Sequence, residues 1–234
     1  ELPVQVEAFK RQQFRWAKGN FQVIRKLIPK LFRSDVPLRV KLMGLLHMSG
    51  YSIHPFMLLA LLLMLPIGLF SPNLMRLYPW AALASFGPPA MILLAKTDQL
   101  PRLADRLKIL PLSLMIGFGL SFSNTIAVFE GLFSKKVGAF VRTPKLNVTG
   151  KGTGWSANQA YNIPLSRNVY WELLLGLYAV AVVVILAPRL GAGVILWGSI
   201  YAIGFFYMAG LNIYQTHKAN RSLSSANLST ICSQ

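Results

Sequence analysis

The run from Tyr51 to Phe70 constrains the fold most strongly, because it holds twenty residues and no charged side chain. As an α-helix this run would be about 30 Å long, which matches the hydrocarbon core of a bilayer. A bilayer core offers no water to unpaired backbone groups, so a single crossing segment must satisfy its hydrogen bonds as a helix. The run therefore predicts a transmembrane helix in an all-α membrane protein.

Three further segments are apolar enough to be spans. Tyr78 to Ala95 is uncharged but interrupted by Pro88 and Pro89, which we expect to kink it. Val169 to Ala187 and Ala192 to Tyr214 flank the short sequence "PRLGA". We expect these last two segments to form a transmembrane hairpin, which brings the total to about four spans.

A fifth segment, Ile109 to Phe133, is long enough to cross but carries serine, asparagine, threonine and glutamate in its second half. Polar groups at bilayer depth are costly unless they face protein or water. If this segment does not cross, 22 of the 24 Lys and Arg residues lie on one side of the membrane, whereas a crossing divides them 15 to 9. The positive-inside rule favours the first topology. We therefore expect an interfacial or re-entrant segment and two cytosolic termini, with five spans as the alternative.

The composition argues against a soluble or nucleic-acid-binding protein. Hydrophobic residues make up 54% of the chain and charged residues only 13%. The basic residues lie beside apolar runs, which is a juxtamembrane pattern, so no nucleic-acid partner is expected. Cys232 is the single cysteine, which excludes an internal disulfide and a cysteine-based metal site.

The segment from Phe9 to Arg33 combines apolar bulk with eight cationic side chains. At 100° per residue the two kinds of side chain occupy opposite arcs of a helix. The apolar arc comprises Phe14, Ala17, Phe21, Ile24, Ile28 and Leu31, and the polar arc comprises Arg11, Arg15, Lys18, Gln22, Arg25 and Lys26. This pattern predicts an interface helix whose apolar side enters the acyl boundary. Lys10 and Gln13 interrupt the apolar arc, so the helix is not a pure membrane anchor.

Gln12, Arg15 and Trp16 stand at i, i+3 and i+4, which places them on one edge of this helix. A guanidinium can hold a phosphate through two hydrogen bonds, an amide can orient it, and an indole offers a flat face to a sugar ring. The alternative is that Trp16 is an interfacial anchor and Arg15 contacts lipid phosphate.

The sequence "QQFRW", Gln12 to Trp16, resembles the Q-x-x-R-W motif of processive glycosyltransferase family 2 enzymes. The longer run "ELPVQVEAFKRQQFRWAKG" is similar to the segment that follows the catalytic domain in bacterial cellulose synthase and in mannan or glucan synthase-like proteins. A second interface stretch, Val36 to Gly50, and membrane spans follow it, as in that family.

The resemblance implies a hexosyltransferase of the bacterial inner membrane. Such an enzyme elongates a β-glycan from a nucleotide sugar with inversion and passes the polymer between its spans. Trp16 would stack on the acceptor sugar, while Gln12 and Arg15 would contact acceptor or diphosphate. The expected partners are therefore a nucleotide sugar, the growing glycan and membrane lipids.

The family also implies a cytosolic gating loop with the pattern F-x-V-T-x-K-G, and residues 134–168 contain two imperfect matches. "FVRTPK" supplies Phe140, Thr143 and Lys145, whereas "LNVTGKG" supplies Thr149 and Lys151. We favour the first match because "RTPK" resembles the mannan or glucan synthase-like relatives. A lysine and a threonine on either motif could reach a diphosphate, and the second match remains open.

The family's aspartate-rich donor motif and its T-E-D-type base do not occur in these 234 residues. In the family they lie upstream of Q-x-x-R-W, on a cytosolic domain that holds Mg²⁺ or Mn²⁺. Since the chain opens with "ELPV", we expect it to be one piece of a longer enzyme and to be inactive alone. We assign no catalytic residue, metal ligand or cofactor to it.

The expected organisation has five parts. Interface helices occupy 1–50, two spans and an interfacial or re-entrant helix occupy 51–133, the gating-type loop occupies 134–168, a transmembrane hairpin occupies 169–214, and a disordered cytosolic tail occupies 215–234. Two other classes remain open, namely part of a transporter or permease, and a polybasic membrane scaffold that binds anionic lipid.

Overall fold

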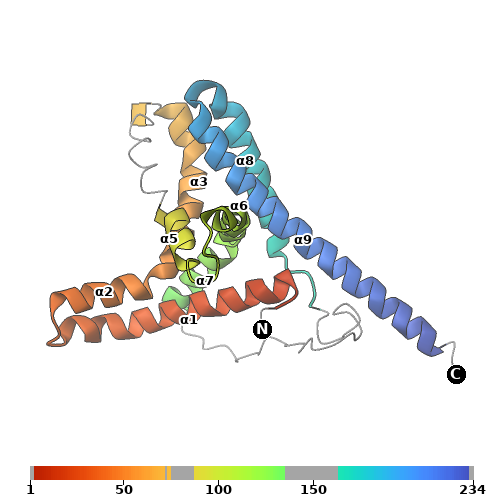
Figure 1. The fold of residues 1–234 in the computed structure, drawn as a ribbon, viewed down its shortest axis with the longest axis horizontal. Coiled ribbons are helices and arrows are strands. Elements are labelled where there is room, and N and C mark those ends of the chain that lie inside the picture. Colours follow the sequence, from red (N-terminus) through yellow and green to blue (C-terminus); the bar gives the residue numbers. More distant parts are fainter. Residues whose placement is uncertain (1–2, 72, 75–86, 135–162, 232–234) are drawn as a thin grey trace. The chain divides into compact units, whose positions relative to one another are not determined.

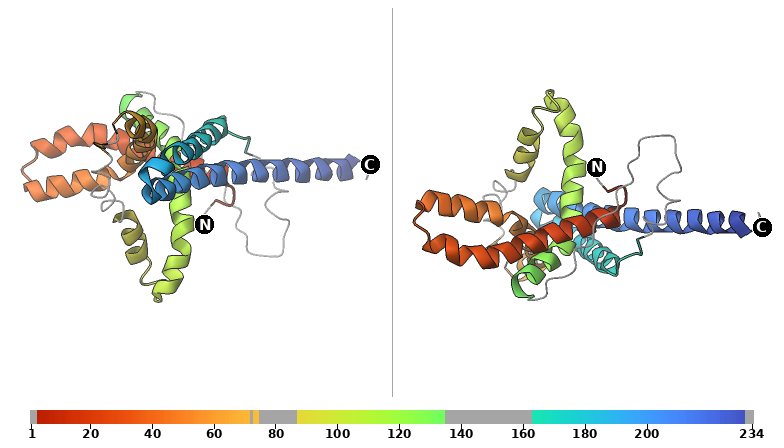
Figure 2. Two further views of the ribbon diagram at one scale, coloured as in Figure 1. Left: turned by 90° about the horizontal axis from the view of Figure 1, so that it is seen from above. Right: turned by 90° about the horizontal axis from the view of Figure 1, so that it is seen from below.

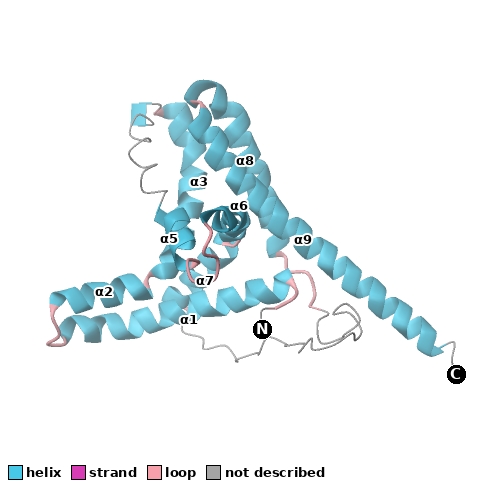
Figure 3. Cartoon of the chain, viewed as in Figure 1, coloured by secondary structure: helices cyan, strands magenta, loops and turns pink. Residues whose placement is uncertain are grey.

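A computed structural model describes residues 3–71, 73–74, 87–134 and 163–231, with side chains described as far as Ser222. The described residues form helices joined by short connections and contain no strand (Figure 3). This agrees with the all-α expectation. In chain order the elements are α1 (Val6–Arg33), α2 (Leu38–Met48), η1 (Gly50–Ser52), α3 (Ile53–Phe70), α5 (Gly87–Ala95), α6 (Leu103–Gly119), α7 (Ser121–Phe133), α8 (Asn168–Leu190) and α9 (Ala192–Ile231).

The chain divides into two compact units, which we describe separately. Unit 1 comprises Glu1–Pro55, Phe122–Tyr170 and Ala209–Gln234, and unit 2 comprises Phe56–Ser121 and Trp171–Met208. Unit 1 therefore holds the helix with the Q-x-x-R-W motif, whereas unit 2 holds most of the apolar helical residues that were expected to cross a membrane.

In unit 1, α1 and α2 pack side by side as a helical hairpin (Figure 1). The turn is closed by hydrogen bonds to the last carbonyl groups of α1, which have no partner inside the helix. The Ser34 hydroxyl donates to the Leu31 carbonyl at 2.6 Å, and the Lys41 ammonium donates to the Phe32 carbonyl at 3.0 Å. Gly44 of α2 faces Leu31 of α1, where a Cβ would lie 3.4 Å from the leucine side chain, an ordinary van der Waals contact.

The apolar arc of α1 packs on protein, which corrects the expectation that it enters lipid. Phe21 and Ile24 are each 6% exposed and form a core cluster with Val128 of α7. Met48 and Tyr51 pack against the same cluster. Helical periodicity identifies an apolar face but not the surface that covers it, and here that surface is supplied by α7 and the end of α2.

Unit 2 is held together by contacts among α3, α6, α8 and α9. Its core cluster consists of Met64, Val182, Leu186 and Val194. Two tyrosine hydroxyls in this unit donate hydrogen bonds to backbone carbonyls of α3. The Tyr178 hydroxyl donates to the Leu62 carbonyl at 2.8 Å, and the Tyr201 hydroxyl donates to the Met57 carbonyl at 2.6 Å. Such bonds join helices where water is scarce.

Small residues bring α6 and α9 of unit 2 into backbone contact. A Cβ on Gly204 would lie 2.8 Å from the Met115 carbonyl oxygen and 3.1 Å from the Gly119 nitrogen. Glycine at such crossings is typical of helix packing in membranes. At this crossing the Phe118 ring packs edge to face on the Tyr201 ring, with 4.5 Å between the ring centroids.

Three described helical segments are long and apolar enough to cross a membrane: Gly50–Phe70, Asn168–Leu190 and Ala192–Ser222. They agree in position with the first expected span and with both arms of the expected hairpin, and that each one crosses a membrane stays a prediction. The hairpin turn is Gly191, whose φ of 77° lies in the left-handed region that favours glycine. The remaining expected span, Tyr78 to Ala95, is described only in its last part, as α5.

The segment from Ile109 to Phe133 consists of two helices rather than one. α6 begins earlier than expected, and the α6–α7 pair is bent by 47°, which fits a broken span or a re-entrant loop. Counting the pair as one span gives four candidate spans within the described residues. Whether the pair crosses remains a prediction. Four of its polar residues are buried, as their cost in lipid requires: Ser121, Ser123, Asn124 and Thr125 are at most 7% exposed. The Glu130 side chain is 43% exposed and pairs with Lys18.

The C-terminal tail was expected to be disordered over 215–234, and this expectation is wrong as far as Ile231. α9 continues from the apolar hairpin arm to that residue without a break. Extending an existing helix avoids the cost of nucleation, so a polar sequence joined to a stable span can remain helical. The last three residues lie outside the described part of the chain.

The glycine crossing of unit 2 can be tested with two substitutions in α9. Gly204→Ala places a methyl group against backbone atoms and should cost about 1–3 kcal/mol of stability. Gly210→Ala is the matched control, because a Cβ there meets nothing within 4 Å and should be neutral or slightly stabilising. Thermal unfolding in detergent should give a lower Tm for Gly204→Ala only; an equal Tm for both variants contradicts the crossing.

Candidate functional site

The three Q-x-x-R-W residues share one edge of α1, as their spacing predicts. The Trp16 indole is 53% exposed, whereas Gln12 and Arg15 are partly buried. The Gln12 side-chain oxygen is buried and has no hydrogen-bond partner among the described residues. This edge therefore combines an exposed aromatic face, a guanidinium and a buried acceptor atom.

The residues predicted for the gating loop lie outside the described part of the chain. This holds for the favoured motif, Phe140, Thr143 and Lys145, and for the alternative, Thr149 and Lys151. Their roles stay predictions.

Close packing on α7 fixes the position of α1. A Cβ on Gly131 would lie 2.6 Å from the Lys18 carbonyl oxygen, so only glycine allows the two helices to approach this closely. Next to it, the Lys18 ammonium meets the Glu130 carboxylate at 2.7 Å. The Arg25 guanidinium donates to the carbonyls of Leu132 and Ser134, each at 3.0 Å. Arg25 thus caps the C-terminal end of α7, where a cation is favourable.

Unit 1 contains two further polar contacts between side chains far apart in the sequence. The Tyr51 hydroxyl donates to the Gln13 side-chain oxygen at 3.2 Å. The His54 Nε2 and the Asn124 side-chain amide are 2.9 Å apart. We expected Gln13 to interrupt the apolar arc but could not name its partner from the sequence.

The N-terminal end of α1 is anchored to α9. The buried Glu7 carboxylate accepts from the Asn212 side-chain amide at 2.9 Å and from the Arg11 Nε at 3.1 Å. The Gln215 side chain forms two hydrogen bonds with the backbone at the start of α1. Its oxygen accepts from the Val6 N–H at 2.7 Å, and its amide donates to the Val4 carbonyl at 3.3 Å. Gln215 therefore satisfies one of the N–H groups that a helix start leaves without a partner.

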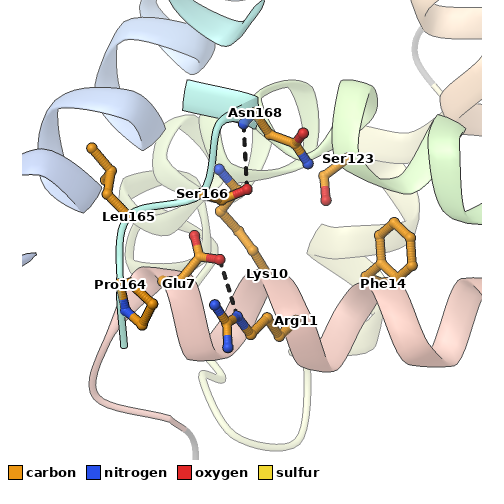
Figure 4. Close-up of a pocket in the computed structure, with 9 residues that line it drawn as sticks. All are labelled: Glu7, Lys10, Arg11, Phe14, Ser123, Pro164, Leu165, Ser166 and Asn168. Atoms are coloured by element: carbon orange, nitrogen blue, oxygen red, sulfur yellow. Dashed lines mark hydrogen bonds and ion pairs between the residues drawn. The ribbon is translucent and has the colours of Figure 1, made fainter. Parts of the chain in front are cut away.

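Beside this anchor, α1 lines a pocket of about 240 Å³ (Figure 4). Glu7, Lys10, Arg11 and Phe14 supply one wall from a single helical face. Ser123 of α7 and residues 164–166 and 168, before and at the start of α8, supply the others. None of Gln12, Arg15 and Trp16 lines this pocket, so α1 presents two separate surfaces. The sequence signal for the pocket was Lys10, a cation on an otherwise apolar arc.

A metal site was not assigned from the sequence. Within the described ranges, no group of three or more His, Cys, Asp or Glu residues is placed so as to hold a metal ion.

Comparisons with known proteins give no further guidance: no family model, curated protein or solved structure matches this chain.

The anchor of α1 predicts a selective effect of Asn212→Leu. This change leaves one oxygen of a buried carboxylate without its donor, which should cost about 1.5–3 kcal/mol. We expect amide hydrogens in the first turn of α1 to exchange roughly ten- to a hundredfold faster, since each 1.4 kcal/mol is a tenfold change in an opening equilibrium. Asn220→Leu is the matched control, because Asn220 is an exposed residue of the same helix. If both variants exchange alike, the anchor has no energetic role.

Proposed function

We propose that this chain is the acceptor-binding and polymer-translocating membrane region of a processive, inverting β-glycosyltransferase. The supporting observation is the shared edge of Gln12, Arg15 and Trp16 on α1, a helix that is not among the candidate spans. On this proposal, the enzyme elongates a polysaccharide from a nucleotide sugar, and its catalytic domain, with the metal, lies in residues that precede this chain.

The chemistry of the edge fits an acceptor sugar. An indole that is 53% exposed offers a flat apolar face, which complements the apolar C–H face of a hexose. Arg15 and Gln12 stand on the same edge by helical spacing, and guanidinium and amide groups are hydrogen-bond donors of the kind that bind sugar hydroxyls.

The arrangement of charge and spans supports the proposed topology. With both termini cytosolic, the basic loops collect on one side of a bacterial inner membrane. α1 then lies at the cytosolic surface, where a growing chain would enter. The loop residues Phe140, Thr143 and Lys145 remain our candidates for the nucleotide clamp.

Replacing Trp16 distinguishes a sugar-binding edge from a membrane anchor. The purified chain is titrated with β-linked hexose oligosaccharides by calorimetry, and Trp16→Ala should lower the affinity by roughly tenfold or more. Phe32→Ala is the control, since Phe32 is an aromatic residue of the same helix with a similar exposure of 47%. In membranes that contain the complete enzyme, Trp16→Ala should also abolish polymer formation from labelled nucleotide sugar.

The competing reading makes the opposite prediction. If Trp16 only anchors α1 in lipid, Trp16→Ala and Phe32→Ala should both weaken binding to lipid vesicles, and neither should change oligosaccharide affinity or polymer yield. That result would overturn the proposed function.

A further inference from the structure

We propose that the exposed apolar face of α2, together with the cations around the α1–α2 turn, binds an anionic lipid surface. The inference does not rest on the proposed glycosyltransferase function, because neither the Trp16 edge nor the gating-type loop takes part in it. It rests on the exposure of the α2 side chains, on the charges beside them and on the place of α2 in the chain.

α2 packs on protein with one face only, and none of its residues is buried. Gly44 faces Leu31 of α1, and Met48 packs against the core cluster around Phe21. At 100° per residue, four large apolar side chains fall on the opposite side of the helix. They are between 47% and 68% exposed: Leu38, Leu42, Met43 and Leu46. A contiguous exposed apolar face of this kind marks an interaction site.

The turn beside this face is strongly cationic. Residues 26–48 contain five lysine or arginine residues and a single acidic residue, Asp35. Lys41 is already bonded to the end of α1. Three further cations are exposed and have no hydrogen-bond or ion-pair partner among the described residues: Lys30, Arg33 and Arg39. The turn therefore carries positive charge that an anionic partner can neutralise.

The combination of the two features fits a lipid surface. Helices that lie in a membrane surface place an apolar face in the acyl boundary and direct lysine and arginine to the headgroups. Arg39 falls within the apolar arc, and its aliphatic stem lets the guanidinium reach the headgroups from there. Each cation near the surface adds attraction only where the lipid is anionic. The face therefore favours anionic over neutral lipid.

The place of α2 in the chain brings it to the membrane. α2 ends at Met48, and a candidate span begins at Gly50. One residue separates them, and a residue extends the chain by at most about 3.6 Å. With 11 residues, α2 is about 16 Å long, roughly half of the hydrocarbon core, so it can lie along the surface but cannot cross. A crossing helix that starts at Gly50 therefore holds α2 at the level of the headgroups.

The contact with lipid is tested on the full chain in lipid nanodiscs, in a Cys232→Ser background. A bimane fluorophore is attached at positions 42 and 46, on the apolar face. Positions 40 and 47 are the matched controls, since Val40 and His47 are exposed residues of α2 outside that face. Lipids with brominated acyl chains should quench the labels at 42 and 46 roughly twofold or more strongly than the controls. Equal quenching at all four positions overturns the proposal.

The preference for anionic lipid is tested with the label at position 46. Brominated phosphatidylglycerol should quench it roughly twofold or more strongly than brominated phosphatidylcholine at the same mole fraction. The triple variant Lys30→Gln, Arg33→Gln, Arg39→Gln should lose this preference. Arg11→Gln is the control, because Arg11 is an exposed cation at the other end of α1, and it should keep the preference. If the parent chain shows no preference, or both variants lose it alike, the proposal is wrong.

Two further measurements keep the test decisive. If the triple variant does not fold, as judged by gel filtration, 1 M salt should remove the preference of the parent chain, since the screening length falls to about 3 Å. A pyrene label at position 46 reports whether a second copy of the chain covers the face instead. Excimer emission from two pyrenes would show such a contact and would overturn the lipid assignment, whereas monomer emission alone agrees with it.

Discussion

The packing of α1 on α7 is the interaction on which the arrangement of unit 1 depends. Gly131 permits backbone contact with Lys18, Phe21 and Ile24 bury their side chains beside Val128, and Arg25 caps the end of α7. The apolar contacts stabilise the packing of the two helices but are non-directional. The glycine contact and the capping hydrogen bonds depend on exact positions, so they fix how the helices are aligned along each other. Because the inner face of α1 is occupied by protein, its other faces are left for ligands.

Two of these faces have different chemistry. One edge presents the exposed Trp16 indole, and the N-terminal pocket presents a buried ammonium among hydroxyl groups. An aromatic face suits a neutral sugar ring. The anchor of Glu7 to Asn212 holds the N-terminal end of α1. The two antiparallel helices α1 and α2 can be followed side by side in the views from above and below (Figure 2).

The sequence predicted those features that depend on composition and local geometry. The uncharged run that ends at Phe70 forms a helix. The expected turn lies at Gly191, whose left-handed backbone conformation favours glycine. The helix with the motif begins at Val6 and ends at Arg33, close to the expected bounds. The grouping of Gln12, Arg15 and Trp16 on one edge followed from helical spacing alone.

Features that depend on long-range packing were missed. The amphipathic pattern of α1 could not distinguish lipid from protein as the cover of its apolar arc, because both are apolar. The partner of Lys18, Glu130, lies more than a hundred residues away in the chain, and no local pattern joins them. The break after Gly119 carries no proline signal, and the helical tail to Ile231 depends on the span that precedes it.

The most direct test of this account measures what covers the inner face of α1. In a Cys232→Ser background, spin labels at positions 24 and 16 are examined in lipid bilayers for collision with oxygen, which partitions into lipid, and with a water-soluble nickel chelate. We predict that the label at position 24 collides little with either reagent and that the label at position 16 is accessible. Frequent oxygen collision at position 24 would mean that the apolar arc faces lipid, and would contradict the packing of α1 on α7.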